Sequence, residues 1–235
     1  FAGYYAAKWQ GYYAQENIEA DIRSAVPSPN KILSAIREVS DGRADFGIGS
    51  ADILIGREKG APLIVLASIF QTSASAFYSL KKTPINGLAS LRNLKVARRH
   101  NDLIDVEFQA MLRAEGIDPA KIKAYPHESG IEHLTSGRVD IIPGYRISIP
   151  FNTNKASIQV TEILPSRYGV DFYGDSLFTH GNLIQRNPDL VRRFVAASLK
   201  GWQYALQHPE EIAQRIAREL PRNSPVIGDD VLGFN

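Results

Sequence analysis

The sequence predicts an α/β fold with mostly parallel strands, because short apolar runs alternate with helix-length segments along its 235 residues. The clearest unit is residues 42–71, where two strand-like runs, 44–48 and 63–70, flank a helix-length segment, 50–59. Gly49-Ser50 places small residues and free backbone N–H groups where the first strand turns into the helix. This corner favours a small molecule with acceptor atoms, which indicates a receptor pocket more than a catalytic centre.

The segment before this unit predicts two helices separated by a strand. Residues 1–15 carry an aromatic stripe and predict a helix that ends near Asn17. Residues 19–25 predict a strand. Residues 31–41 predict a second helix, because apolar residues recur at helical spacing before Gly42 ends it.

The alternation continues after residue 71. We expect helices at residues 88–92, 102–115 and 129–135, and strands at residues 76–80, 95–97, 122–125, 139–142 and 158–163. Residues 176–185 predict an extended segment. Asn187-Pro188 then predicts the start of a long helix, because proline is favoured at the first helical position, and the acidic residues after Pro209 predict the start of another.

Composition excludes several classes of protein. A hydrophobic content of 44% supports a full core, and a net charge of +2 argues against a dedicated nucleic-acid surface. We interpret the local basic clusters, Arg98-Arg99-His100 and Arg192-Arg193, as solvated faces. No apolar run approaches the roughly 20 residues of a membrane span. The chain begins without Met, so we expect a fragment of a longer protein whose targeting segment is not in this sequence.

Residues typical of catalytic and metal sites lack the spacing that such sites need. The chain has no cysteine, which excludes disulfides, thiolate metal sites and cysteine nucleophiles. Its five histidines show no metal-ligand spacing with acidic residues or with one another. A Gly47-to-Asp52 stretch superficially similar to a dinucleotide fingerprint lacks the third glycine. We therefore predict no catalytic residue, no metal and no cofactor.

Several segments together resemble one protein family. They are FAGYYAAK at residues 1–8 with GYY at 11–13, GRADFGI at 42–48, KGAP at 59–62, IFQ at 69–71 and GRVD at 137–140. In this order and spacing they resemble the thiamine-pyrimidine-synthase-like group of type II periplasmic solute-binding proteins. That group includes pyrimidine-precursor, alkanesulfonate and nitrate binders of ABC importers.

The resemblance implies a periplasmic-binding-protein type II fold, with two Rossmann-like α/β lobes joined by a two-strand hinge. Carried onto this chain, lobe one is residues 1–72 plus 175–235, and lobe two is residues 73–174. The hinge strands become residues 72–75 and 173–176. The resemblance also implies an extracytoplasmic location and a small-molecule ligand, pyrimidine-like or another small heterocyclic or anionic solute, bound between the lobes for ABC-type import.

Ligand-facing residues are expected where strands end and helices begin. On that rule we predict a binding site formed by Tyr4, Ser50, Gln71, Arg99, Tyr145 and Asp175. The tyrosines would stack on a planar ligand while the polar groups hold its edge. Alternative roles are packing of Tyr4 on the sheet, capping of the hinge by Asp175 and solvation of Arg99. Ile149 stands where many relatives carry a glutamate before proline, which leaves the ligand open.

Two other functions follow from narrower resemblances. Residues 172–179 and 201–211 resemble versions of the domain fused to bacterial sensor kinases and diguanylate cyclases, so the alternative is a ligand-sensing domain. The family also includes a thiamine-pyrimidine biosynthetic enzyme with a cysteine-rich iron-binding motif, which this chain lacks. The expected partner is an ABC permease or a fused output domain. Nucleic acid is not expected, and membrane contact is expected only through a partner or a segment outside this sequence.

Overall fold

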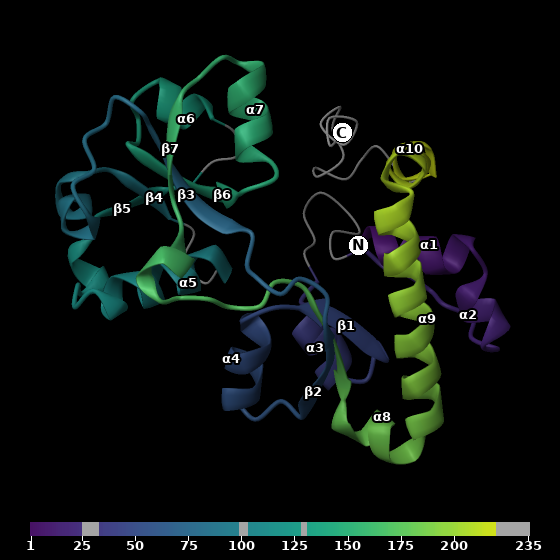
Figure 1. Cartoon of the computed structure of the whole chain (residues 1–235). Helices are drawn as coiled ribbons and strands as arrows, with labels where there is room; N and C mark the ends of the chain where they lie inside the picture. The colour runs from purple at the N-terminus through teal and green to yellow at the C-terminus, as the bar shows by residue number, and fades with distance from the viewer. Residues whose placement is uncertain (25–32, 99–102, 128–130, 220–235) are drawn as a thin grey trace. The chain divides into compact units, whose positions relative to one another are not determined.

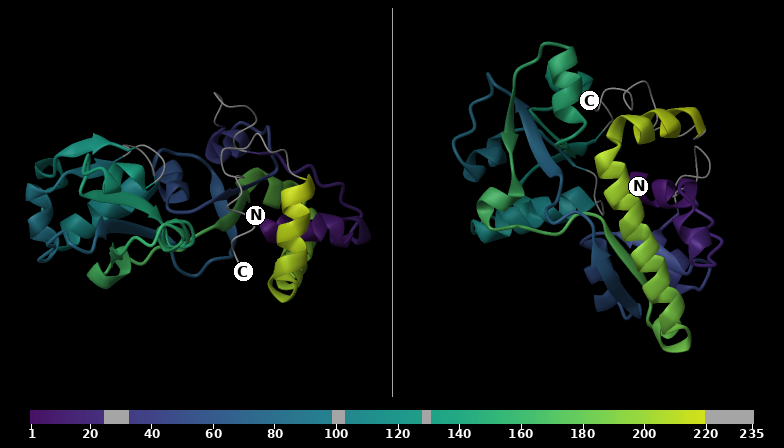
Figure 2. Two further views of the ribbon diagram at one scale, coloured as in Figure 1. Left: turned by 90° about the horizontal axis from the view of Figure 1, so that it is seen from above. Right: turned by 45° about the vertical axis from the view of Figure 1, so that its right-hand side comes forward.

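The computed structural model describes residues 1–24, 33–98, 103–127 and 131–219. The chain divides into two compact units. The first unit contains Phe1–Ile69 together with the chain from Ser176 onward, and the second contains Phe70–Asp175. The second unit is therefore one continuous insertion in the sequence of the first, and Figures 1 and 2 colour it from blue to green.

The first unit is built on a three-stranded sheet in the order β1 (Phe46–Gly49), β8 (Ser176–His180), β2 (Leu63–Ser68). The central strand β8 runs antiparallel to both neighbours. Successive side chains of β8 point to opposite faces: Leu177 packs with one hydrophobic cluster and Phe178 with another. A register shift interrupts the β2–β8 pairing between Val65 and Ala67.

Helices cover both faces of this sheet. Helices α3 (Ala35–Ser40) and α4 (Asp52–Glu58) contribute to the Phe178 cluster, whereas α1 (Ala2–Trp9) and α9 (Pro188–Gln207) contribute to the Leu177 cluster. The described residues of this unit also form α2 (Tyr12–Gln15), α8 (Gly181–Arg186) and α10 (Pro209–Glu219). Asn187 caps α9, since its Oδ1 accepts the N–H of Leu190 at 3.1 Å.

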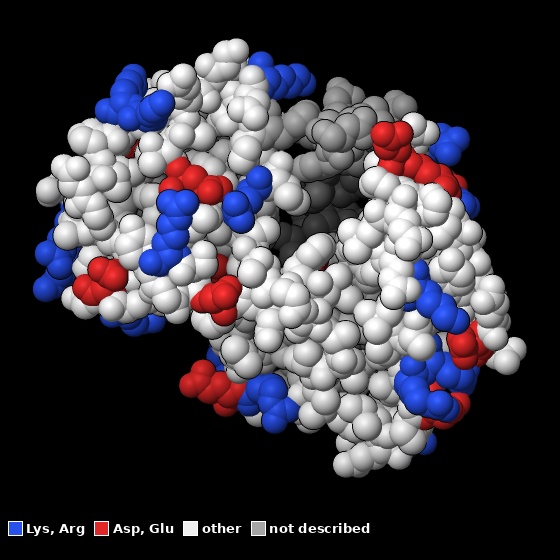
Figure 3. Space-filling model, viewed as in Figure 1, with Lys and Arg blue, Asp and Glu red and all other residues white. Residues whose placement is uncertain are grey.

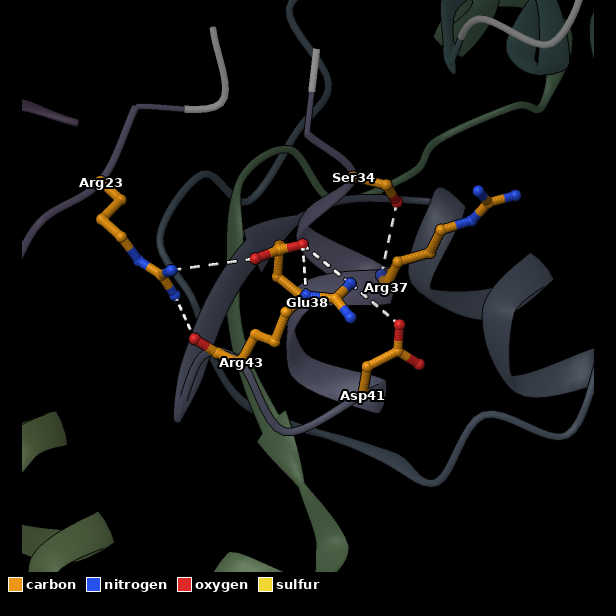
Figure 4. A network of polar contacts seen from close by, with 6 residues as sticks. All are labelled: Arg23, Ser34, Arg37, Glu38, Asp41 and Arg43. Atoms are coloured by element: carbon orange, nitrogen blue, oxygen red, sulfur yellow. Dashed lines mark hydrogen bonds and ion pairs between the residues drawn. The ribbon is translucent and has the colours of Figure 1, made fainter. Parts of the chain in front are cut away.

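The connection from α3 to β1 is held by a polar network around Glu38. Oε1 of Glu38 accepts a hydrogen bond from Nε of Arg43 at 2.9 Å and forms an ion pair with Nη2 of the same arginine at 2.9 Å (Figure 4). Arg43 also pairs with Asp41 at 2.9 Å. Arg23 extends the network to Glu38 and to the backbone oxygen of Arg43. Gly42, with φ of 70°, makes the tight turn that this arrangement needs.

The second unit is built on a five-stranded sheet. The strand order is β5 (Ala124–Pro126), β4 (Val96–Arg98), β6 (Ile141–Tyr145), β3 (Ser75–Leu80), β7 (Val160–Ile163). Strand β4 is parallel to β5 and β6, while β3 is antiparallel to β6 and β7. Neighbouring residues again serve opposite faces: Phe77 and Ile141 join one core, and Tyr78 and Ile142 join the other.

Each face of the second sheet has its own helices (Figure 1). One core is formed with α5 (Leu103–Ala114) and the 3₁₀ helices η1 (Leu88–Asn93) and η3 (Pro165–Tyr168). The other is formed with α6 (Glu132–Thr135) and α7 (Ile149–Lys155). A further 3₁₀ helix, η2 (Pro119–Lys121), precedes β5.

Several predicted elements differ from the structure. The expected mostly parallel pairing is wrong, because β8 and β3 each run antiparallel to two neighbours. The predicted 1–15 helix is broken at Gly11, whose φ of 73° is left-handed. Residues 19–24 of the predicted 19–25 strand form no strand. Helix α7 was not predicted, and α8 replaces the end of the extended segment predicted at 176–185.

Candidate functional site

In the first unit, three strand ends meet at the edge of the sheet where the chain leaves and returns. Ser176, at the start of β8, pairs with Gly49 at the end of β1 and with Ser68 at the end of β2. The hydroxyl oxygens of Ser68 and Ser176 lie 3.0 Å apart. This edge therefore combines small residues with hydroxyl groups, which is a suitable surface for a polar ligand.

Ser50 directly follows this edge, and its hydroxyl oxygen is buried. Its backbone N–H donates to Oδ1 of Asp52 at 2.7 Å, which fixes the turn from β1 into α4. The Ser50 hydroxyl has no hydrogen-bond partner among the described residues. A buried hydroxyl without a partner is costly, so a ligand atom that bonded it would gain free energy.

Tyr4 is packed inside the first unit. Its side chain is only 3% exposed, and its ring meets that of Trp202 edge-on, with centroids 5.7 Å apart. A Cβ on the neighbouring Gly3 would lie 2.2 Å from the Trp202 ring, so this contact depends on glycine. The Tyr4 ring thus packs inside the first unit, which is the alternative role expected for this residue. A contact between Tyr4 and a ligand stays a prediction.

Gln71 and Asp175 lie at the two ends of the second unit, in the segments through which the chain enters and leaves it. The N–H of Phe70 donates to the oxygen of Asp175 at 3.3 Å, and the N–H of Gly174 donates to the oxygen of Phe70 at 2.9 Å. Gln71 is exposed and Asp175 is half-buried. These two segments, the first crossover segment (residues 70–74) and the second crossover segment (residues 173–175), are thus hydrogen-bonded to each other beside the predicted site residues.

Tyr145 lies at the end of β6, opposite Ser75 at the start of β3, and its side chain is 43% exposed. The following residue, Arg146, forms an ion pair with Glu162 at 3.3 Å, and Glu162 also accepts the hydroxyl of Tyr78 at 2.8 Å. Burial and the Glu162 carboxylate raise the pKa of Tyr78, which remains a hydrogen-bond donor. Arg99 lies outside the described residues.

Sequence reasoning missed a buried carboxylate next to the first crossover segment. Glu107 of α5 is 1% exposed and accepts the hydroxyls of Ser73 at 2.6 Å and Ser75 at 3.2 Å. Burial raises the pKa of Glu107, while the two serine hydrogen bonds act in the opposite direction. The available signal was an acidic residue between Val106 and Phe108, in the apolar part of the helix.

A buried ion pair corrects the interpretation of Arg98 in the basic cluster at residues 98–100, of which Arg99 and His100 lie outside the described residues. Arg98 forms two hydrogen bonds with the Asp105 carboxylate, at 2.6 and 3.1 Å, and their side chains are 6% and 3% exposed. The Arg98 guanidinium also lies 5.2 Å from the Phe108 ring centroid. Arg98 is therefore not solvated, because it joins the end of β4 to the first turn of α5.

The described residues form neither a surface patch of one charge on the face shown nor a cluster of metal ligands. The face in Figure 3 shows Lys and Arg interspersed with Asp and Glu rather than gathered into a patch of one sign. In the part of the chain that the structure describes, no group of three or more His, Cys, Asp and Glu side chains is arranged to hold a metal ion. Within the same residues, no helix combines the length and the apolar character needed to cross a bilayer.

Comparison with protein families identifies the class to which the chain belongs. The model of the family described as "NMT1/THI5 like" matches residues 1–212, which is most of the chain. The chain therefore belongs to the NMT1/THI5-like family, and the family predicted from its sequence motifs is confirmed.

A curated relative is the riboflavin-binding protein RibY of Chloroflexus aurantiacus. The two sequences are 27% identical over 217 residues, which cover 90% of this chain and 60% of RibY. The chain thus spans less than two thirds of the length of this relative.

Solved structures confirm the predicted fold. A putative periplasmic sulfonate-binding protein, SsuA of Methylobacillus flagellatus, superposes with a TM-score of 0.67 at 18% identity, covering 98% of this chain and 70% of its own. The desulfurization enzyme DSZB superposes with a TM-score of 0.61 at 14% identity, covering 99% of this chain and 80% of its own. The chain has the periplasmic-binding-protein fold, and this fold is shared by binding proteins and by an enzyme.

Proposed function

We propose that this chain is the solute-binding component of an ABC-type importer and acts outside the cytoplasm. The observation that carries the proposal is the NMT1/THI5-like match over residues 1–212. The likeness to RibY and to SsuA supports binding as the activity, because both are named as binding proteins. The permease partner follows from the same likeness, since SsuA is named as part of an ABC transporter.

The residues at the strand ends support a binding role for each unit. The first unit offers the Ser50 hydroxyl, which is buried without a hydrogen-bond partner among the described residues. The second offers the exposed Tyr145 ring with Gln71 and Asp175 on its crossover segments. An apolar wall with a few placed polar groups is the usual composition of a small-molecule site. We propose that closure of the two units on the solute brings these groups together.

Riboflavin is the first ligand to test, because a planar isoalloxazine ring suits stacking on tyrosine and RibY is named for this ligand. The chain would be titrated with riboflavin, an aminopyrimidine and an aliphatic sulfonate, by calorimetry and by flavin fluorescence. We expect saturable 1:1 binding of a planar heterocycle. Absence of binding to all three compounds by correctly folded chain would contradict the proposed function.

Two variants connect the ligand to the predicted site. Tyr145→Ala should weaken riboflavin binding about ten- to hundredfold, because it removes a large stacking surface worth about 1–3 kcal/mol. Tyr145→Phe is the matched control: it keeps the ring and should bind within about threefold of the parent. Equal affinity of Tyr145→Ala and the parent would place the site elsewhere, even if the chain binds riboflavin.

A further inference from the structure

The first crossover segment enters the second unit over a buried acidic side chain. Ser73 lies within this segment, and Ser75 begins β3. Both serines reach the Glu107 carboxylate of α5, at 2.6 Å from Ser73 and 3.2 Å from Ser75. Ser75 is 2% exposed and Glu107 is 1% exposed, so water cannot easily replace either partner.

The number of hydrogens that each side chain can donate limits the hydrogen-bond network of Ser73, Ser75 and Glu107. A serine hydroxyl has one hydrogen to donate, and an ionised carboxylate accepts only. When Glu107 is ionised, Ser73 and Ser75 can both donate to it, and their own oxygens, 3.0 Å apart, then share no hydrogen. The Ser73 oxygen then accepts the backbone N–H of Ser75 at 3.1 Å. The result is a short side-chain turn whose geometry depends on a carboxylate from another element.

The other end of the same segment is held differently. Phe70 exchanges backbone hydrogen bonds with the second crossover segment, at 3.3 Å with Asp175 and at 2.9 Å with Gly174. Between Phe70 and Ser73 lie only Gln71 and Thr72, and both are exposed. The segment thus has two anchored ends and a two-residue exposed link between them.

We propose that Glu107 is a positioning residue that anchors the first crossover segment on α5 and confines bending of this segment to Gln71 and Thr72. The inference rests on the proposed function, in which the crossover segments act as the hinge of a closing protein. Residues from Ser73 onward then move as part of the second unit. Gln71, the predicted ligand contact, is part of the link that bends.

Amide hydrogen exchange of the ligand-free chain tests the anchor directly, so the result does not depend on whether riboflavin binds. The Ser75 amide reports the turn, and the Tyr78 amide, in the middle of β3, reports general opening of the sheet. Glu107→Ala and Ser73→Ala should each accelerate Ser75 exchange at least about tenfold while Tyr78 changes less than about threefold. If Glu107→Ala does not fold, Glu107→Met, which removes the carboxylate with little change in side-chain length, carries the test; Ser73→Ala removes the acceptor of the Ser75 amide itself and sets the size of the full effect.

Two matched variants complete the experiment. Glu107→Gln keeps a carbonyl acceptor and should restore most of the Ser75 protection. Ser79→Ala removes a hydroxyl from the same strand that is 0% exposed and has no hydrogen-bond partner among the described residues, so Ser75 exchange should stay unchanged. The proposal is overturned if Ser75 keeps its wild-type rate in Glu107→Ala, accelerates there only as much as Tyr78, or is not protected in Glu107→Gln.

Discussion

At the scale of single residues, Glu107 predicts how stability depends on pH. Its pKa is raised by burial, so the folded chain holds a proton at pH values where the unfolded chain has released it. Stability therefore falls as pH rises from the ordinary carboxyl pKa, about 4.3, to the raised value. Glu107→Gln abolishes this loss, so the unfolding free energy of the variant minus that of the parent should rise across the window and then level off.

Urea unfolding at a series of pH values from about 4 to 8 measures this difference. Ser79→Ala is the control, because it changes a buried residue of β3, the strand that begins with Ser75, without changing a titratable group, and its effect should be the same at every pH. A Glu107→Gln difference that is equally constant would show that Glu107 titrates alike in the folded and unfolded chain.

The Arg98–Asp105 pair predicts a large loss of stability from a single substitution. Arg98→Met leaves the Asp105 carboxylate buried without its guanidinium partner, which costs about 3–5 kcal/mol for pairs of this kind. The matched change is Arg192→Met, since Arg192 pairs with Asp189 on the surface and its side chain is 79% exposed. We expect urea unfolding to show a much lower midpoint for Arg98→Met and almost no change for Arg192→Met.

The buried carboxylates of Asp105 and Glu107 also show which single-residue contacts the sequence alone does not predict. Tyr145 and Asp175 could be chosen by their place after a predicted strand or before one, and the structure does place them at strand ends. Arg98 stands beside Arg99 and His100 and looks like part of a solvated cluster. Its burial depends on Asp105, which only the packing of α5 on β4 brings within 2.6 Å. Glu107 depends in the same way on Ser73 and Ser75, 32 and more residues away.

At the scale of elements, the contact between α1 and α9 predicts that a helix-favouring substitution will destabilise the chain. Alanine gains about 1 kcal/mol over glycine in a helix interior. A Cβ at position 201, however, would lie 2.2 Å from the backbone oxygen of Gly3 and 2.5 Å from the Ala7 Cβ. Gly201→Ala should therefore cost about 1–3 kcal/mol, because the two helices must move apart.

Gly181→Ala is the control for this prediction. A Cβ there would lie 3.5 Å from the Pro62 oxygen, which is ordinary contact, and position 181 is also helical. This variant should be neutral or slightly more stable, and chemical unfolding of the two variants side by side measures the contrast. Equal stability of Gly201→Ala and the parent would mean that α9 can shift on α1 at little cost.

Helices and strands were predicted correctly where the residues of one segment show the pattern themselves. The prediction failed where the pairing of one strand with another decides the structure. Residues 188–207 have both a proline start and a periodic apolar face, and they form the single long helix α9. Residues 19–24 look like a strand by composition but pair with no described strand. Strand β8 lies between β1 and β2 and runs antiparallel to both, a pairing that the alternation of strands and helices along the sequence does not reveal.

At the scale of the whole molecule, family motifs spread over the chain predicted the fold class, which the solved structures confirm. The same motifs do not select a ligand, because a few side chains in the site decide its identity. Ile149 illustrates the difficulty. It packs in the core beneath β6, and a Cβ on Gly144 would meet it at 2.3 Å, so this position serves packing in the present chain.

The inserted second unit leads to a prediction about independent folding. Residues 70–175 contain both apolar clusters that flank the five-stranded sheet, and the ends of this segment are hydrogen-bonded to each other through Phe70, Gly174 and Asp175. A unit with its own core and adjacent ends is expected to fold when it is expressed alone. We therefore expect residues 70–175 to unfold cooperatively in urea and to give dispersed amide NMR signals.

Phe108→Ala provides the control within this segment. The Phe108 side chain is 0% exposed and fills the core beside Phe77, so its truncation should cost about 3–5 kcal/mol, most of the stability of a small domain. The isolated segment should then lose its cooperative transition, whereas Ser79→Ala should retain it. If the unsubstituted segment shows no transition, its core is completed by the first unit, and the two units fold only together.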